Sequence, residues 1–116
     1  MKIEQRRAGD ITILDIEGRL TMNDGRGQLK TLVADLIDRN HVQVLLNLAD
    51  LRYLDSACLG EIINSHIKLS RKDGKLKLLN MPDHLAELLK LAGLTGIFET
   101  FSSETDAVQS FQAPAS

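Results

Sequence analysis

The sequence has few aromatic residues, almost no net charge and no long apolar run. Of its 116 residues only three are Phe, one is Tyr and none is Trp, which argues against binding nucleic acid by stacking on its bases. The 14 basic residues nearly cancel the 16 acidic ones, so the formal net charge of −2 offers no footprint for a phosphate backbone or an anionic membrane. The longest stretches without a charged residue, 40–49 and 107–116, are about half as long as a membrane-spanning helix. We therefore expect neither direct binding of nucleic acid nor insertion into a membrane.

Cysteine and metal-ligand patterns are equally sparse. The single cysteine, Cys58, cannot form a disulfide within the chain, and the first residues lack the apolar core of a signal peptide, so we expect a cytoplasmic protein. His41, His66 and His84 stand apart, without His-x-His or Cys-x-x-Cys spacing, and no metal site is expected. Residues 25–30 begin like a nucleotide-binding loop but lack its third Gly and the Lys-Ser/Thr of a P-loop. We expect no cofactor.

Aliphatic periodicity defines the first half of the chain. Alternation over 11–16, followed by Gly18, predicts a strand that ends in a turn, and a weaker strand over 2–6 would pair with it as a hairpin. An apolar stripe at helical spacing predicts a helix over about 24–39, with Asn23 or Asp24 as its cap. The stripe consists of Leu29, Leu32, Val33, Leu36 and Ile37. The nearly continuous apolar run 42–48 is typical of a central strand covered on both faces.

The second half alternates helices and strands. A connector over 49–54 precedes a helix over about 56–72 that Gly74 would end, and residues 75–79 form the next strand. Pro82 opens a third helix that Gly93 closes, Phe98 marks a short strand, and residues 105–111 form a last helix. These alternating elements predict an α/β fold with right-handed crossovers: a mainly parallel mixed sheet of about four to five strands, with the N-terminal hairpin antiparallel, flanked by about four helices. We expect one domain over 1–111 and a flexible C-terminal tail over 112–116.

Two loops, 18–27 and 50–60, follow predicted strands and are expected at the carboxyl edge of the sheet, where ligands and partners usually bind. Asp55 and Ser56 lie in the second loop at the start of a helix. Unpaired backbone N–H groups and the positive end of the helix dipole favour an acceptor oxygen or an anion there. From position alone, an ordinary helix cap and an anion-binding site both remain open.

Residues 48–60, Leu-Ala-Asp-Leu-Arg-Tyr-Leu-Asp-Ser-Ala-Cys-Leu-Gly, resemble the strand-loop-helix signature of STAS domains, the anti-sigma-factor antagonists. The family pattern is hydrophobic-Asp-Ser-small-Gly-Leu-Gly. The order of elements, Gly18-Arg19-Leu20 and the Leu-rich helix before Gly93 extend the resemblance over essentially the whole chain. Cys58 stands where the family usually has Gly. A Cβ is harmless there at helical angles, but the larger side chain raises the question of whether a kinase can still approach Ser56.

The resemblance implies a phosphorylation-controlled partner switch. The unphosphorylated protein would bind a serine kinase that is also an anti-sigma factor, and so release a sigma factor. Phosphorylation of Ser56 would end the binding. The kinase would supply ATP and Mg²⁺, a phosphatase would reset the switch, and the sequence leaves a homodimer open. Partner contacts are implied at Asp24, Asp55, Ser56, Ala57, Cys58 and Gly60. Asp24 equally suits a helix cap.

There are two alternatives to the switch. STAS-like domains also resemble adaptor subunits of lipid or anion transporters and of stress-signalling scaffolds, in which Ser56 need never be modified. An enzyme is disfavoured because Ser56 lacks the Gly-x-Ser-x-Gly elbow, and His66, ten residues along the same helix, lies roughly 15 Å away. We expect His66 at the edge of the core, Cys58 packed in the first helical turn, and no catalytic residue.

Overall fold

The computed structural model describes residues 1–23, 25 and 27–112, which form one five-stranded sheet and four helices. The predicted Asp24 contact and the tail residues 113–116 lie outside this described part. The elements in chain order are β1 (Lys2–Ala8), β2 (Ile11–Leu20), α1 (Gln28–Asp38), β3 (Gln43–Leu54), α2 (Ser56–Ser70), β4 (Lys75–Leu79), α3 (Asp83–Leu91), β5 (Thr100–Phe101) and α4 (Glu104–Gln112).

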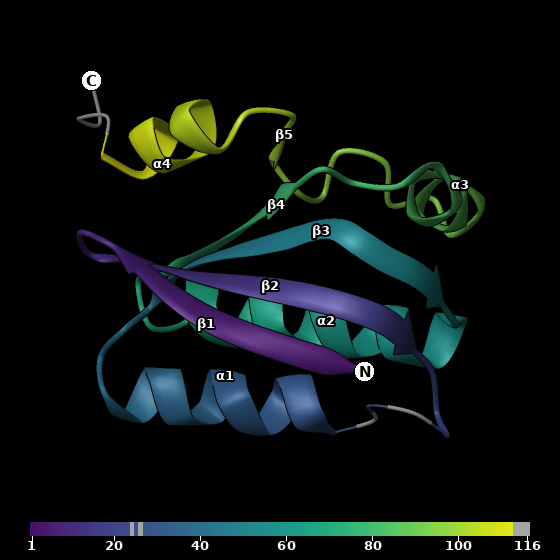
Figure 1. Ribbon diagram of the computed structural model, residues 1–116, viewed down its shortest axis with the longest axis horizontal. Helices are drawn as coiled ribbons and strands as arrows, with labels where there is room; N and C mark the ends of the chain where they lie inside the picture. Colours follow the sequence, from purple (N-terminus) through teal and green to yellow (C-terminus); the bar gives the residue numbers. More distant parts are fainter. Residues whose placement is uncertain (24, 26, 113–116) are drawn as a thin grey trace.

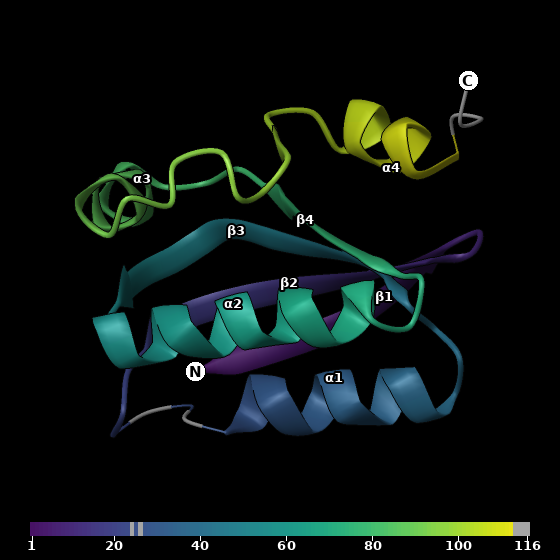
Figure 2. The same ribbon diagram turned by 180° about the vertical axis from the view of Figure 1, so that it is seen from behind.

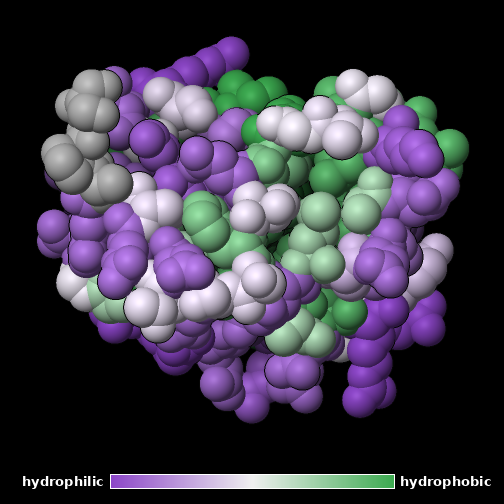
Figure 3. All heavy atoms as spheres, turned by 90° about the horizontal axis from the view of Figure 1, so that it is seen from above, coloured by the Kyte–Doolittle hydropathy of each residue, from purple (hydrophilic) through white to green (hydrophobic). Residues whose placement is uncertain are grey.

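The strands are ordered β1-β2-β3-β4-β5 across the sheet. β1 pairs with β2 antiparallel, and the other three pairings are parallel, which confirms the predicted mixed α/β fold with its N-terminal hairpin. α1 and α2 lie side by side against one face of the sheet, and α3 and α4 lie on the other side (Figures 1 and 2). Figure 3 looks onto the side that carries α3 and α4, where apolar side chains show through between polar ones.

Strand parity divides the core into two layers. Along β2, Leu14 and Ile16 join the large cluster under α1 and α2, whereas Ile11 and Ile13 join a smaller cluster under α4. β3 does the same, since Val44, Leu46 and Leu48 face the large cluster and Leu45 the small one. The predicted central strand is therefore buried on both faces, as its continuous apolar run indicates.

Several predicted boundaries are wrong, and the strands account for most of the difference. The residues predicted as a connector, 49–54, continue β3 to Leu54. β2 likewise runs past Gly18 to Leu20, because Gly18, at φ 99, lies at an irregularity in the pairing with β3 rather than in a turn. Phe98 belongs to no strand; it is buried in a loop, and β5 comprises Thr100 and Phe101.

The helices also begin and end differently from the prediction. α1 begins at Gln28 with Gly27 at its N-cap, and no side-chain cap is supplied by that residue, so Asn23 is not the cap. Gln112, predicted to belong to the tail, is the last residue of α4. Gly93 follows α3 at φ 72 and closes it as predicted, with the Leu94 N–H bonded to the Leu89 carbonyl at 2.8 Å.

Gly74 is needed for space and not for the helix terminator role predicted for it. The left-handed residue after α2 is Asp73, at φ 61. A Cβ on Gly74 would lie 2.2 Å from the Val42 carbonyl oxygen, because the start of β4 passes directly beside the residue before β3. Gly60, inside α2, is the opposite case, since a Cβ there would meet no atom within 4 Å.

These two glycines provide a matched pair of stability predictions. Gly74→Ala should lower the free energy of unfolding by about 2–3 kcal/mol, because a backbone carbonyl must move. Gly60→Ala should raise it by about 1 kcal/mol, because alanine loses less backbone entropy in a helix. Urea unfolding followed by circular dichroism measures both changes. Equal effects of the two substitutions would contradict the assigned roles.

Candidate functional site

The candidate site lies at the edge of the sheet where β2 and β3 end. Leu20 and Leu54, the last residues of these parallel strands, are paired in register, so the loop after β2 and the start of α2 meet at one edge as predicted. The Asp55 N–H donates to the Leu20 carbonyl at 3.2 Å and closes the junction. Because β3 leads into α2 through a single residue, the site is attached directly to the sheet.

Asp55 holds the two loops together through its carboxylate. Oδ1 accepts the N–H of Cys58 at 2.9 Å and thereby caps α2, whereas Oδ2 accepts the N–H of Met22 at 2.9 Å in the loop after β2. The Cys58 N–H, followed by the Met22 N–H, lowers the pKa of Asp55 below its ordinary value. Asp55 is therefore an ionised cap that also fixes the neighbouring loop.

Ser56 is the first residue of α2 and is exposed, as is Ala57. Within the described residues its hydroxyl makes no hydrogen bond. It stands at a helix N-terminus, where unpaired N–H groups and the helix dipole favour negative charge. A phosphate on this oxygen would extend into solvent at an electrostatically favourable position.

The side chain of Cys58 packs in the first turn of α2, as expected, and is not part of the exposed surface. The residue is 1% exposed and packs in the large core cluster. Its position three residues after the cap turns its side chain inward, so the sulfur does not stand between Ser56 and an approaching protein. Gly60 is partly exposed and, with Ala57 and Gly27, lines a groove of about 390 Å³ between α1 and α2.

Glu61 is a structural residue of the site that sequence reasoning missed. Its two carboxylate oxygens accept the N–H groups of Lys30, at 2.9 Å, and Gly27, at 3.3 Å. A side chain of α2 thus satisfies the first turn of α1, which has no cap of its own. No local motif could have indicated this, because the donor and acceptor are more than 30 residues apart.

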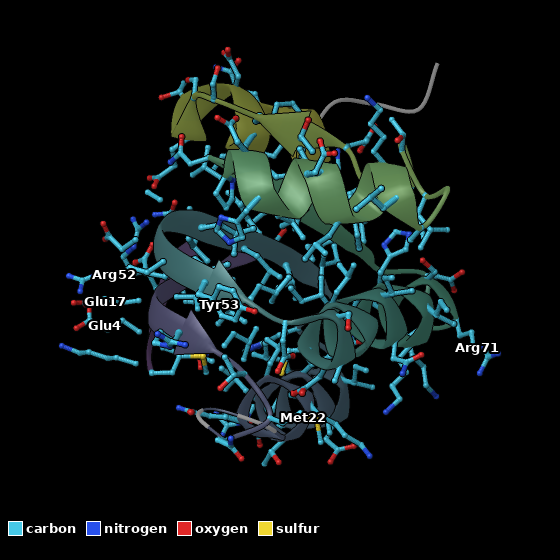
Figure 4. The ribbon with its side chains drawn as sticks, turned by 90° about the vertical axis from the view of Figure 1, so that its right-hand side faces the viewer. Glu4, Glu17, Met22, Arg52, Tyr53 and Arg71 are labelled. Atoms are coloured by element: carbon cyan, nitrogen blue, oxygen red, sulfur yellow. The ribbon has the colours of Figure 1, made fainter. Side chains whose placement is uncertain are left out.

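Tyr53 and Met22 are exposed apolar residues at the same edge, also missed from the sequence, and Figure 4 shows where each lies. Their exposed fractions are 46% and 50%. The Arg19 guanidinium lies 5.1 Å from the centroid of the Tyr53 ring, and the His84 ring stacks on it at 6.4 Å. Residues 49–54 are predicted as a connector, so the sequence alone does not indicate a role for Tyr53. The pairing of β2 with β3 places it opposite Arg19.

His66 lies at the edge of the core, as expected, with its ring edge-on to Phe98 at 5.1 Å. In the part of the chain that the structure describes, no group of three or more His, Cys, Asp or Glu side chains is placed to hold a metal ion. None of the described helices combines the length and the apolar character needed to span a bilayer.

Comparisons with known proteins agree with this geometry. The sequence profile of the family described as "Mlab, STAS domain" matches residues 3–99. BtrV of Bordetella bronchiseptica, whose name assigns it to the anti-sigma factor antagonists, is 25% identical over 112 residues, or 97% of this chain and 96% of that protein.

Two solved structures share the fold. A protein of Thermotoga maritima, described among anti-sigma factor antagonists, superposes with a TM-score of 0.87 at 20% identity, covering 96% of this chain and 95% of that one. The phosphorylated form of the Bacillus cell fate determinant SpoIIAA gives a TM-score of 0.76 at 17% identity, covering 94% of this chain and 98% of that one.

The lowered pKa of Asp55 predicts how Asp55→Asn changes the acid sensitivity of the fold. An ionised Asp55 stabilises the folded state above its unfolded pKa of about 3.9, and this contribution is lost as the pH falls through the folded value. At neutral pH, Asp55→Asn should be the less stable protein, because one amide oxygen replaces two acceptors. Urea unfolding at about pH 6 and about pH 3 should show this difference shrinking in acid. A stability difference that does not change with pH would contradict the role of the Asp55 charge. The pKa values of Asp15 and Glu99 are also lowered, but these groups titrate in both proteins, so their contribution cancels in the comparison of wild type with Asp55→Asn.

Proposed function

Because the chain belongs to the STAS domain family, we propose that it is an anti-sigma factor antagonist that works as a phosphorylation-controlled partner switch. In its unphosphorylated form it binds a serine kinase that is also an anti-sigma factor, and a sigma factor is released. Phosphorylation of Ser56 ends that binding. The observation that carries the proposal is the exposed Ser56 hydroxyl, which makes no hydrogen bond to the described residues, at the N-terminus of α2.

The position of Ser56 supports a signal sent through the surface rather than through unfolding. A phosphate adds about −1.5 to −2 charges at neutral pH, and a helix N-terminus accommodates such an anion. The domain therefore stays folded when modified. Since the formal net charge of the whole chain is −2, one phosphate nearly doubles it and concentrates the change beside Asp55.

Partner release follows from the cost of burying that charge. An interface that covers Ser56 must desolvate the phosphate, and the effective penalty for a buried charge without a matching partner is several kcal/mol. A loss of about 1.4 kcal/mol already weakens binding tenfold. One modification at this edge is therefore sufficient to separate the two proteins.

The surface available to the kinase consists of Ser56, Ala57 and the open side of Gly60. Cys58 is withdrawn from it by burial, so the residue that departs from the family pattern leaves the approach to Ser56 unobstructed. Asp55 acts mainly by holding the loop after β2 in place. Asp24, in that loop, remains a proposed contact.

Other proteins catalyse the addition and removal of the phosphate. The kinase supplies ATP and Mg²⁺, a phosphatase removes the phosphate, and Ser56 is a substrate and not a nucleophile in catalysis. His66, the one histidine on α2, lies nearly three helical turns along from Ser56 and packs against Phe98, so it does not act as a base on the Ser56 hydroxyl. The domain itself contributes a folded recognition surface.

Phosphorylation in vitro tests the proposal. The protein is incubated with the cognate serine kinase and ATP, and intact mass is measured. Wild type should gain one phosphate, and Ser56→Ala should gain none. Ser70→Ala is the matched control, because Ser70 is an exposed serine at the opposite end of the same helix and its loss should leave the reaction unchanged.

Binding by the purified phosphorylated protein completes the test. Its affinity for the kinase should fall by at least about tenfold relative to the unphosphorylated form, whereas its melting temperature should remain close to that of the unmodified protein. Absence of added phosphate on wild type, or equal phosphorylation of Ser56→Ala, would refute the switch. Recovery of a transporter subunit in place of a kinase in a pull-down would favour the adaptor role.

A further inference from the structure

The exposed Tyr53 ring is held in place by two neighbours. Arg19, paired with it in the parallel register of β2 and β3, places its guanidinium 5.1 Å from the ring centroid. His84, from α3, stacks against it with an interplanar angle of 13°. A tyrosine that is 46% exposed and already immobilised loses little entropy when a second protein covers it. Such side chains are frequent anchors of protein interfaces.

Basic side chains outnumber acidic ones in the hollow beside this ring. An open hollow of about 690 Å³ beside Tyr53 is lined by Lys2, Arg19 and Arg52, with Glu17 as its one acidic residue. Lys2 is occupied by Glu4, whose carboxylate lies 2.9 Å away and raises the pKa of the lysine. Among the described residues, neither Arg19 nor Arg52 forms an ion pair.

The hollow and the candidate site both include residues at the end of β3 or directly after it. Tyr53 precedes Ser56 by three residues at the end of β3, and the Asp55 carboxylate holds the neighbouring Met22 through its N–H. In Figure 4, which looks at the edge of the sheet where these strands end, Arg52 lies to the left of Tyr53 with Glu17 and Glu4 next to it, and Met22 lies lower in the view. Arg71 lies on the opposite side of the same view, at the far end of α2.

We propose that Arg19, Arg52, Tyr53 and Met22, here called the Tyr53 platform, bind an acidic segment of the same anti-sigma factor that covers Ser56, with an apolar side chain of that segment resting on the Tyr53 ring. The inference rests on the proposed function and identifies the partner chemistry that it requires. Two unpaired guanidinium groups beside an exposed aromatic face are complementary to a carboxylate next to an apolar side chain.

The same chemistry explains the direction of the switch. Carboxylates of the partner that are drawn to Arg19 and Arg52 lie close to Ser56 in the complex, so a phosphate there adds repulsion to the cost of its own desolvation. A second copy of this chain is a less suitable partner for the platform. A two-fold contact would bring the same basic patch to both sides of the interface and supply no additional acidic group.

Binding kinetics of the unphosphorylated protein with the kinase that modifies Ser56 test the platform. Arg52→Glu should lower the association rate about tenfold at low salt, because it opposes an acidic partner, and the difference should diminish as salt is raised. Arg71→Glu is the matched control: it makes the same charge change on an exposed residue far from the platform and should associate at the wild-type rate.

The apolar contact is tested separately. Tyr53→Ala should raise the dissociation rate at least about tenfold, whereas Tyr53→Phe, which keeps the ring and its stacking on His84, should dissociate like wild type. Thermal unfolding verifies that all four variants are folded at the assay temperature.

The outcomes separate this inference from the proposed function. If wild type binds the kinase but Arg52→Glu associates at the same rate as Arg71→Glu, the partner presents no acidic segment to Arg52, and the proposed role of the platform is refuted. Equal dissociation of Tyr53→Ala and Tyr53→Phe would refute it as well. Failure of wild type to bind any serine kinase would refute the proposed function itself.

Discussion

Both oxygens of the Asp55 carboxylate accept main-chain N–H groups, one at the start of α2 and the other in the loop after β2. These two hydrogen bonds fix the loop after β2 against the start of α2, two segments that the sheet brings close but does not itself connect. Glu61 repeats the arrangement six residues further along, with both oxygens on N–H groups at the start of α1. Two acidic side chains thus accept main-chain N–H groups and hold neighbouring segments of the domain together.

The order and type of the elements could be predicted because burial imposes its period on the sequence. Residues 42–48 indicate a strand covered on both faces, and the stripe of α1 indicates a helix with one buried face. The exact ends of the strands and helices could not be predicted. Residues 49–54 mix Asp50 and Arg52 with apolar neighbours and extend β3 only because an irregular parallel pairing with Gly18 and Arg19 accepts them. The start of α1 depends on Glu61, which is distant in sequence.

The residues of the candidate site likewise fall into those that local sequence identifies and those that only the tertiary structure identifies. Asp55 and Ser56 could be identified from local chemistry, because a cap followed by an exposed serine is a property of a few consecutive residues. The inward direction of Cys58 follows from helical period once the cap is placed, and its burial confirms the packing expected in the first turn. The Tyr53 platform had no local signal, since the two residues that hold the Tyr53 ring, Arg19 from β2 and His84 from α3, are brought beside it only by tertiary structure.

The longest strand of the sheet, β3, runs without interruption to within two residues of Ser56. The serine therefore has no flexible tether, unlike a phosphoacceptor in a disordered segment, which can be drawn into a kinase cleft as an extended peptide. A kinase that modifies Ser56 must bring its active site to a rigid body. Its selectivity then resides in the shape and charge of a folded surface, and exposed residues such as Arg52 and Tyr53 can change from one relative to another without disturbing the sheet that carries them.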